Sequence, residues 1–287
     1  MRAFPFSDLL DGLPTIKVVD IGAAPVEGAE DAYAAIVRRG LARVVGFEPI
    51  EEVCDALNEQ ARGKHVYLPL VVGNGAEAQF HRCADPAMSS VFAPDKAAMA
   101  LFQTLGDAAE VVERFEVETV RLDDIEEAAG ADYLRVGIQG GAGAALAGAE
   151  QTLRHAVVVH IRAEFVPLYV DQPLFGEVDE VLRAFGFEFH KFVGLGGRTF
   201  KPLVAGENEN AALSQFLWAD AVYAKDFATF ADLPEDRLLK LAVILHEVYR
   251  SFDLAALAIK HHDAKTDAGL WPAYIKRLTT DRPPRDG

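Results

Sequence analysis

The hydrophobic pattern of residues 16–49 predicts a strand, a tight turn, a helix and a second strand. An apolar run at 16–21 carries one acid, Asp20, and Gly22 follows it directly. Apolar residues then recur at helical spacing over 32–37, and a second apolar run at 44–47 ends on Glu48 and Pro49. This succession is the plan of a nucleotide-binding βαβ unit, in which a glycine lets the backbone approach the ligand.

The turn after Gly22 distinguishes this unit from two common nucleotide motifs. It continues Ala-Ala-Pro, so the G-x-G-x-x-G fingerprint of dinucleotide sites is missing, and no G-K-[ST] follows as in a P-loop. An acid such as Glu48 at the end of the second strand can accept hydrogen bonds from two ribose hydroxyls. Asp20 and Glu48 therefore suit a site for S-adenosylmethionine (SAM), although the same acids would also serve as polar strand ends in a plain βαβ unit.

The rest of the chain alternates strands with helices and ends in a helical stretch. We expect strands at 65–72, 78–82, 115–122, 132–138, 156–165, 187–193 and 216–223, and helices at 7–10, 51–61, 143–153, 176–184 and 234–260. A long loop at 85–105 should hold a helix in its later half, and the tail 279–287 should fray. This order predicts an α/β fold with a Rossmann-like, doubly wound, mainly parallel sheet and antiparallel end strands. We expect one α/β domain, 1–230, with a C-terminal helical extension, 231–287, packed on it.

Composition narrows the class of partner. The 287 residues carry a formal net charge of −16, which argues against a nucleic acid or an anionic membrane as partner, because both need a basic surface. The two cysteines, Cys54 and Cys83, form neither a metal spacing nor a disulfide framework. The N-terminus lacks the apolar core of a signal peptide, and no apolar run is long enough for a membrane span. These features predict a cytoplasmic protein.

Several strings, in this order and spacing, resemble the FkbM family of SAM-dependent methyltransferases. The resemblance covers residues from about 15 to 260 and rests on VDIGA at 19–23, VVGFEP at 44–49, the pair Ser89-Ser90, RLDDI at 121–125, DYLRVGIQG at 132–140, EFVPLYVDQPLF at 164–175 and LWADAVYAKD at 217–226. It implies a class I methyltransferase type of sheet and SAM as the cofactor. It also implies methyl transfer to a hydroxyl oxygen of a sugar or another small metabolite.

The resemblance assigns roles to several positions of this chain. The first motif, under the methionine and ribose part of SAM, corresponds to Asp20, Gly22 and Ala23. The ribose-binding acid corresponds to Glu48, followed by Pro49. The residues near the adenine correspond to Val72, Gly73 and Asn74, and the serine pair on a loop over the site to Ser89 and Ser90.

Three departures from the family pattern put catalysis in question. The family usually carries acids where this chain has Gly137, Ala142 and Arg162. The alternative is therefore a catalytically degenerate methyltransferase-fold protein that acts as a binding or scaffold partner. An enzyme needs an open channel to the SAM methyl group, whereas such a descendant can have that channel filled by side chains.

Polar residues on the predicted strand 156–165 are the candidates for chemistry. His160, Arg162 and Glu164 alternate with apolar residues and so share one face of the strand. His160 suits a general base for a hydroxyl proton, with Glu164 orienting it and Arg162 holding an anionic acceptor. A structural ion pair between Arg162 and Glu164 is the alternative. Gln139 suits a hydrogen bond to the amino-acid part of SAM or to the acceptor, and equally a satisfied turn amide.

No metal site is expected. The string at 246–250 begins H-E-x-x but ends on Arg250, and the adjacent His261 and His262 point about 100° apart on a helix. Asp123 and Asp124 fit the N-cap and first turn of a short helix. The predicted end strands and the apolar helical tail offer an interface for a homodimer.

Overall fold

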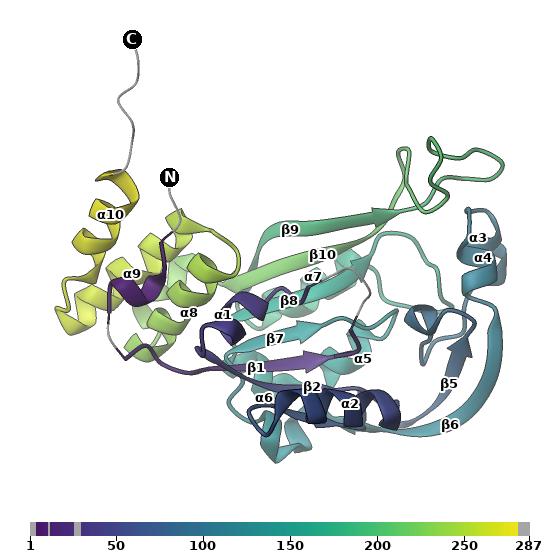
Figure 1. Cartoon of the computed structure of the whole chain (residues 1–287), viewed down its shortest axis with the longest axis horizontal. Helices are drawn as coiled ribbons and strands as arrows, with labels where there is room; N and C mark the ends of the chain where they lie inside the picture. Colours follow the sequence, from purple (N-terminus) through teal and green to yellow (C-terminus); the bar gives the residue numbers. More distant parts are fainter. Residues whose placement is uncertain (1–3, 11, 26–29, 281–287) are drawn as a thin grey trace, which may run out of the picture.

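The computed structural model describes residues 4–10, 12–25 and 30–280 and shows a seven-stranded sheet at the centre of the molecule (Figure 1). The strand order is β3-β2-β1-β7-β8-β10-β9. Strands β3, β2, β1, β7 and β8 are parallel, and β10 runs antiparallel to both β8 and β9. The predicted doubly wound sheet with antiparallel end strands is therefore confirmed. Its strands are β1 Ile16–Ile21, β2 Ala42–Phe47, β3 Val66–Leu68, β7 Tyr133–Val136, β8 Val158–Glu164, β9 Phe187–Gly197 and β10 Phe216–Lys225.

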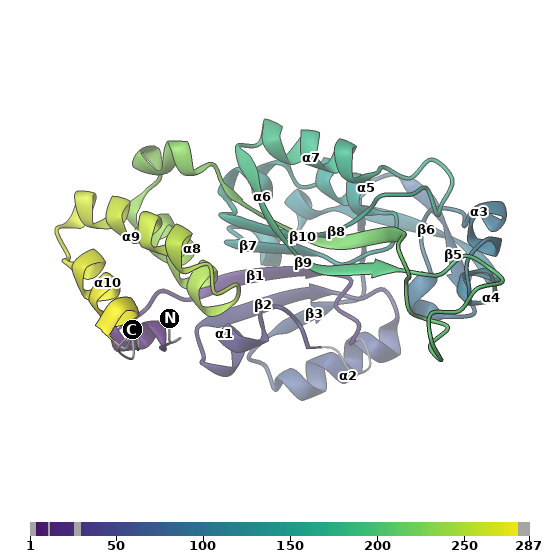
Figure 2. The same cartoon turned by 90° about the horizontal axis from the view of Figure 1, so that it is seen from above.

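Helices cover both faces of this sheet, as Figure 2 shows. On one face lie α1 Ala34–Arg38, α2 Glu51–Ala61 and α8 Glu235–Glu247, and on the other α5 Ala142–Ala147, α6 Glu150–His155 and α7 Phe175–Ala184. Alternate residues of each strand enter the two cores, so that Val18 packs with α8 whereas Val19 packs with α5 and α6. The apolar pattern of the strands thus builds two hydrophobic layers from one sheet.

The predicted strand 65–72 is broken in two. Its first part, β3, pairs with β2 in the main sheet, whereas β4 Val71–Gly73 pairs with β6 Val111–Arg121 in a separate three-stranded sheet. Pro69 lies between them and has no N–H for a ladder, and Leu70 N instead bonds the carbonyl of Leu68. β5 Glu77–Cys83 completes the small sheet, and α3 Lys96–Ala100 and α4 Leu105–Ala108 occupy the loop predicted to be partly helical.

Three other predicted elements are also divided or reassigned. The expected helix 143–153 is two helices, α5 and α6, that meet at Gly148 and Ala149. Asp123 lies in a short 3-10 helix, Leu122–Asp124, and its carboxylate accepts from the backbone N–H groups of Gln151 and Thr152 at the start of α6. Asp123 therefore does cap a helix, but that helix is α6 and not the one directly after Asp123. The lead-in helix is a 3-10 turn, Phe6–Asp8.

The C-terminal part forms three helices, α8, α9 Phe252–Thr266 and α10 Leu270–Thr280, of which α10 was not predicted. α8 ends before Arg250, which adopts a left-handed conformation with φ 51°. His246 on α8 lies between Phe4, whose carbonyl is 2.6 Å from Nε2, and Tyr274, whose hydroxyl is 2.9 Å from Nδ1. This histidine therefore joins the two ends of the chain. Residues 281–287 of the expected frayed tail lie outside the described residues.

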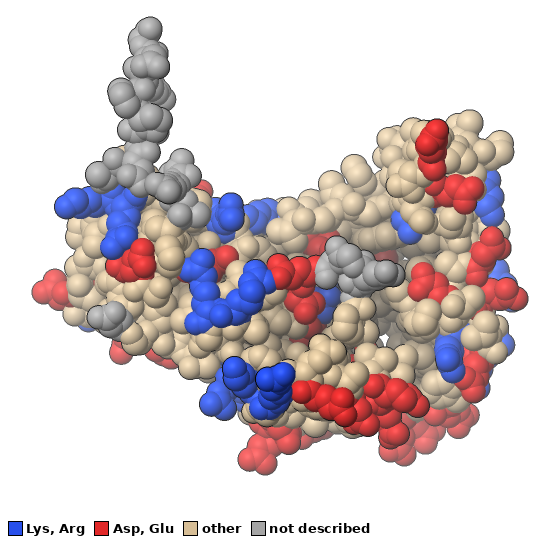
Figure 3. All heavy atoms as spheres, in the orientation of Figure 1, with Lys and Arg blue, Asp and Glu red and all other residues tan. Residues whose placement is uncertain are grey.

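The surface carries charges of both signs. Acidic side chains gather along the lower edge of the face in Figure 3, over α2, and basic side chains gather beside them. The described part of this face is thus not the continuous basic surface that nucleic acids select. Within residues 4–10, 12–25 and 30–280, no helix combines the length and apolar character needed to cross a bilayer.

The contact between α5 and β4 generates a prediction about stability. A Cβ on Gly148 would lie 2.1 Å from the carbonyl oxygen of Gly73 and 3.1 Å from Cα of Arg121, and backbone atoms cannot move aside easily. Gly148→Ala should therefore lower the free energy of unfolding by about 1–3 kcal/mol or more. Gly176→Ala on α7 is the matched control, since a Cβ there meets open space, and it should stay within about 1 kcal/mol of the parent. Urea unfolding would measure both, and equal effects would contradict the prediction.

Candidate functional site

Polar side chains replace apolar ones toward the carboxyl ends of the central strands. On the face that α1 and α8 share, Asp20 of β1 lies beside Arg135 of β7, which lies beside His160 of β8. Over this row lies a cavity of about 460 Å³, here called the sheet-face cavity. It is lined by Glu30, Asp31, Ala32, Ala87, Arg135, Val136, Gly137, His160, Arg162, Val193, Asp220, Val248 and Tyr249.

Asp20 is fully buried, and both of its carboxylate oxygens have partners. Arg135 Nη1 donates to Oδ1 at 2.6 Å, and the Tyr33 hydroxyl donates to Oδ2 at 2.5 Å. Burial raises the pKa of Asp20, and the Arg135 guanidinium works against that rise. Asp20 therefore holds Arg135 and Tyr33 in place and does not line the cavity, in contrast to the predicted contact with the cofactor.

Gly22 brings the ends of β1 and β7 together. Its φ of 84° is left-handed, and a Cβ there would lie 2.8 Å from Cγ2 of Ile138 and 3.2 Å from the carbonyl oxygen of Gly137. The N–H groups of Gly22 and Ala23 both donate to the carbonyl of Phe47, at 3.0 Å each. The turn is thus anchored on β2 and leaves space for glycine only. Residues 26–29, which follow it, lie outside the described residues.

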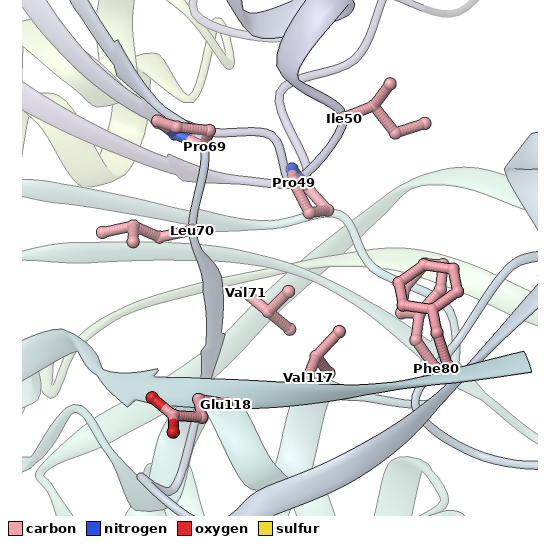
Figure 4. A pocket seen from close by; sticks show the side chains of 9 residues that line it. Pro49, Ile50, Pro69, Leu70, Val71, Phe80, Val117 and Glu118 are labelled. Atoms are coloured by element: carbon pink, nitrogen blue, oxygen red, sulfur yellow. The ribbon is translucent and has the colours of Figure 1, made fainter.

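Glu48 lies at the end of β2 next to a second, apolar cavity. Its side chain is largely buried, Oε1 accepts from Ile50 N at 3.1 Å, and burial raises its pKa. The second cavity, here called the apolar cleft, has a volume of about 270 Å³. It is lined by Pro49, Ile50, Pro69, Leu70, Val71, Phe80, Phe115, Val117 and Glu118, most of which Figure 4 labels.

The predicted adenine contacts Gly73 and Asn74 lie away from both cavities and line neither of them. Gly73 packs against Thr119, and the Asn74 side chain accepts from Ala76 N in its own turn. Sequence reasoning missed Phe80 and Phe115, which lie opposite each other across β5 and β6 with ring centroids 5.3 Å apart. Both positions fall in predicted strands, so pairing those two strands would have revealed the aromatic pair.

His160 is held by two tyrosine hydroxyls. Its Nδ1 lies 3.3 Å from the Tyr133 hydroxyl and 3.1 Å from the Tyr249 hydroxyl, and the two hydroxyl oxygens are 2.7 Å apart. Burial lowers the pKa of His160 to about 4, so the ring is neutral at pH 7. Among the described residues none bonds its Nε2, and the ring lines the sheet-face cavity.

Arg162 pairs with Asp220 on β10. Nε lies 3.0 Å from Oδ1, and Nη2 lies 3.2 Å from Oδ2, which is a two-point contact. The expected ion pair with Glu164 is therefore wrong. Residues two apart on one strand are farther from each other than directly opposed residues on paired strands, and β10 places Asp220 opposite Arg162. Asp220 thus occupies Nε and Nη2 of Arg162, and the expected role of Arg162 in holding an anionic acceptor stays a prediction.

Glu164 lies deeper and serves the turn between β7 and α5. It is 1% exposed, and its Oε1 accepts from Gly140 N at 3.3 Å. Burial raises its pKa to about 7, against the influence of the Gly140 bond and of Arg162. No bond joins Glu164 to His160, so the expected orienting role is wrong, and Tyr133 and Tyr249 fill it instead.

The serine pair divides into two roles. The Ser90 hydroxyl donates to the Gln139 carbonyl at 2.6 Å and accepts from Phe92 N, so it ties the loop after β5 to the β7–α5 turn. The Ser89 hydroxyl accepts from Cys83 N at 3.0 Å within its own turn. Gln139 is thus engaged through its carbonyl, while its side chain is half-buried.

No group of three or more His, Cys, Asp or Glu side chains is arranged to hold a metal within the described ranges. His246, the first residue of the incomplete H-E-x-x motif, is occupied by Phe4 and Tyr274. His262 on α9 lies 3.6 Å from the carboxylate of its neighbour Asp263. These histidines have structural partners.

Known structures offer distant likenesses. A putative methyltransferase from Thermoplasma acidophilum is 10% identical, with a TM-score of 0.38, over 75% of this chain and 70% of that one. The N-terminal domain of EvdMO1 with SAH bound is 10% identical, with a TM-score of 0.35, over 77% of this chain and 78% of that one. A SAM-dependent methyltransferase from Methanosarcina mazei is 12% identical, with a TM-score of 0.34, over 79% of this chain and 99% of that one. TM-scores this low carry no weight for the function of this chain.

Sequence comparison assigns the family. No curated protein matches the chain significantly. Residues 20–189, more than half of the chain, match the family model described as the methyltransferase FkbM domain. The match begins at Asp20 near the end of β1 and includes the Gly22 turn, Glu48 and the polar strand β8. The chain therefore belongs to the FkbM family of SAM-dependent methyltransferases.

Proposed function

We propose that this chain transfers a methyl group from SAM to a hydroxyl oxygen of a small acceptor, with sugars the first class to test. The sheet-face cavity carries the proposal. This cavity is open and includes Gly137, the residue after β7, in its lining. Hydrogen-bond donors and acceptors both line it. A non-catalytic descendant can have this space filled by side chains, and an enzyme needs it open, so the open cavity supports an enzyme.

The residues along the strand ends fit SAM. The apolar cleft beside Pro49 and Ile50 suits a planar adenine, because apolar and aromatic groups surround it. Glu48 next to it offers carboxylate oxygens to the ribose hydroxyls. The Gly22 turn comes directly after the neighbouring strand β1, and Gly137 comes directly after β7, which pairs with β1. The amino-acid end of the cofactor therefore belongs at the entrance of the sheet-face cavity.

The chemistry needs little beyond positioning. SAM supplies a methyl group that is already activated by its sulfonium, so the protein must orient a hydroxyl and accept its proton. With its ring hydrogen on Nδ1, which then donates to a tyrosine hydroxyl oxygen, His160 offers Nε2 as the acceptor for this proton. A weak base suffices, because the hydroxyl proton becomes strongly acidic as the new carbon–oxygen bond forms.

The Arg162–Asp220 pair suits the remaining hydroxyls of a neutral acceptor. Asp220 accepts hydrogen bonds and Arg162 donates them, and both line the cavity beside His160. Their charges cancel, so the pair does not favour a phosphate or a carboxylate at this position. A polyhydroxylated molecule such as a sugar presents both donors and acceptors, which matches the pair.

Glu48→Gln tests the cofactor site. Loss of the carboxylate should weaken the binding of S-adenosylhomocysteine (SAH) about 10-fold to 100-fold, because hydrogen bonds to a charged group are lost. Isothermal titration calorimetry of the purified chain measures this. Glu51→Gln, an exposed acid at the start of α2, is the matched control and should bind SAH as the parent does. Absence of SAH binding by the parent chain would refute the proposed function.

His160→Gln tests the proton acceptor. We expect kcat for methylation of an accepted sugar to fall about 100-fold or more, with SAH affinity unchanged. Tyr249→Phe should give a smaller loss, about 10-fold, because it removes the hydroxyl that orients Nδ1 but keeps the ring. Transfer of a labelled methyl group from SAM measures both. Unchanged kcat in His160→Gln would remove this residue from the mechanism.

Glu164 should make stability depend on pH near neutrality. Its pKa is raised from 4.5 to about 7, so the folded chain binds this proton more tightly than the unfolded chain. That contribution is complete below about pH 4.5 and is lost as the pH rises through about 7. Between about pH 5 and pH 8 the parent should therefore lose stability relative to Glu164→Gln, by up to about 1.4 kcal/mol per pKa unit. Urea unfolding at several pH values measures this, and a constant difference would contradict it.

A further inference from the structure

The Arg135 guanidinium occupies the space above Gly137, where the family usually has an aspartate. A Cβ on Gly137 would lie 2.8 Å from Cζ of Arg135 and 2.9 Å from each Nη atom. Glycine at this position therefore leaves room for the Arg135 side chain to extend along its own strand toward the carboxyl end. An acid here would displace the guanidinium, so the missing acid and the placement of Arg135 are one structural change.

One edge of the guanidinium remains open to the sheet-face cavity. Nη1 donates to Asp20 Oδ1 at 2.6 Å and to the Gly22 carbonyl at 3.0 Å. Among the described residues nothing accepts from Nε or Nη2, and the side chain, 15% exposed, lines the cavity. Burial acts to lower the pKa of Arg135, but the carboxylates of Asp20 and, more weakly, Asp31 hold it above its usual range. A fixed positive group thus faces the cavity.

A carboxylate lines the same cavity. Asp31 lies in the segment that leads into α1, and its backbone carbonyl accepts from Ala34 N. Its carboxylate is exposed and bonds to none of the described residues. The neighbouring acid Glu30 is already paired with Arg38. Asp31 is therefore the carboxylate left for a ligand on this side.

We propose that Arg135 and Asp31 bind the zwitterionic amino-acid end of the cofactor, Arg135 its carboxylate and Asp31 its ammonium group. The inference rests on the proposed SAM site, which puts this end of the cofactor past the Gly22 turn and beside Gly137. Arg135 and Asp31 line one cavity and are not bonded to each other, so both charges are available to the two ends of a zwitterion. Gln139, the residue first expected here, does not line this cavity.

Two ligands separate this subsite from the rest of the cofactor site. SAH carries the amino-acid end, and 5′-methylthioadenosine has the same nucleoside without it. Arg135→Met and Asp31→Asn should each weaken SAH binding about 10-fold to 100-fold in calorimetric titration, because each loses a charge-assisted hydrogen bond. Binding of 5′-methylthioadenosine should stay unchanged. That second titration also shows that Arg135→Met folds, although it leaves Asp20 without its ion-pair partner.

Gly137→Ala tests the placement of Arg135. The added Cβ meets only the flexible end of Arg135, so it should shift the guanidinium and weaken SAH binding without unfolding the chain. In the Arg135→Met background the same substitution should have no effect, since nothing remains to be displaced. Arg135→Lys should restore part of the affinity, because it keeps the positive charge.

The outcomes are distinguishable. Loss of SAH binding alone in the Arg135 and Asp31 variants supports the inference. Loss of neither ligand in these variants, or equal loss of both in Asp31→Asn, which leaves the Asp20–Arg135 pair intact, overturns it, while SAH binding by the parent chain still supports the cofactor site. If the parent chain binds neither ligand, the proposed function fails and the inference fails with it.

Discussion

The buried carboxylate of Asp20 is the constraint on which the site depends. A charge without solvent must be paired and hydrogen-bonded, and removing one partner of a buried pair costs about 3–5 kcal/mol. Asp20 meets this demand with Arg135 from the neighbouring strand and Tyr33 from the entrance to α1. One carboxylate thereby fixes β7 relative to β1 and holds the segment before α1 against the sheet. The open edge of Arg135 is a result of this pairing.

The sequence was informative where structure is local. The strand–turn–helix–strand order, α2 at 51–61 and the glycine at the first turn follow from periodicity and from the φ that only glycine adopts easily. The position of Glu48 at the end of β2 likewise followed from the apolar run before it. In the same way, the alternation over β8 correctly placed His160, Arg162 and Glu164 on one face.

Side-chain contacts between residues far apart in the sequence could not be predicted from these local patterns. Tyr133 and Tyr249 are 116 residues apart, and Arg162 and Asp220 are 58 residues apart. Which acid meets Arg162 depends on the register of β10, and a single-residue shift would turn Asp220 to the other face. The absence of an acid at Gly137 suggested decay from the sequence alone. Its physical reason, the guanidinium above it, appears only when the side chains are placed.

The packing of α8 has a consequence for how the chain folds during synthesis. Its buried face includes Leu238, Leu241 and Leu245, and it completes the hydrophobic layer under β1 and β7. Most of the sheet precedes α8 in the sequence by many residues, so one apolar face of the strands stays uncovered while the ribosome is still translating. A nascent chain halted before α8 emerges would expose that face to chaperones or to other chains. Tyr249, which contacts His160, follows α8 directly, so this part of the site also forms only after α8 has been made.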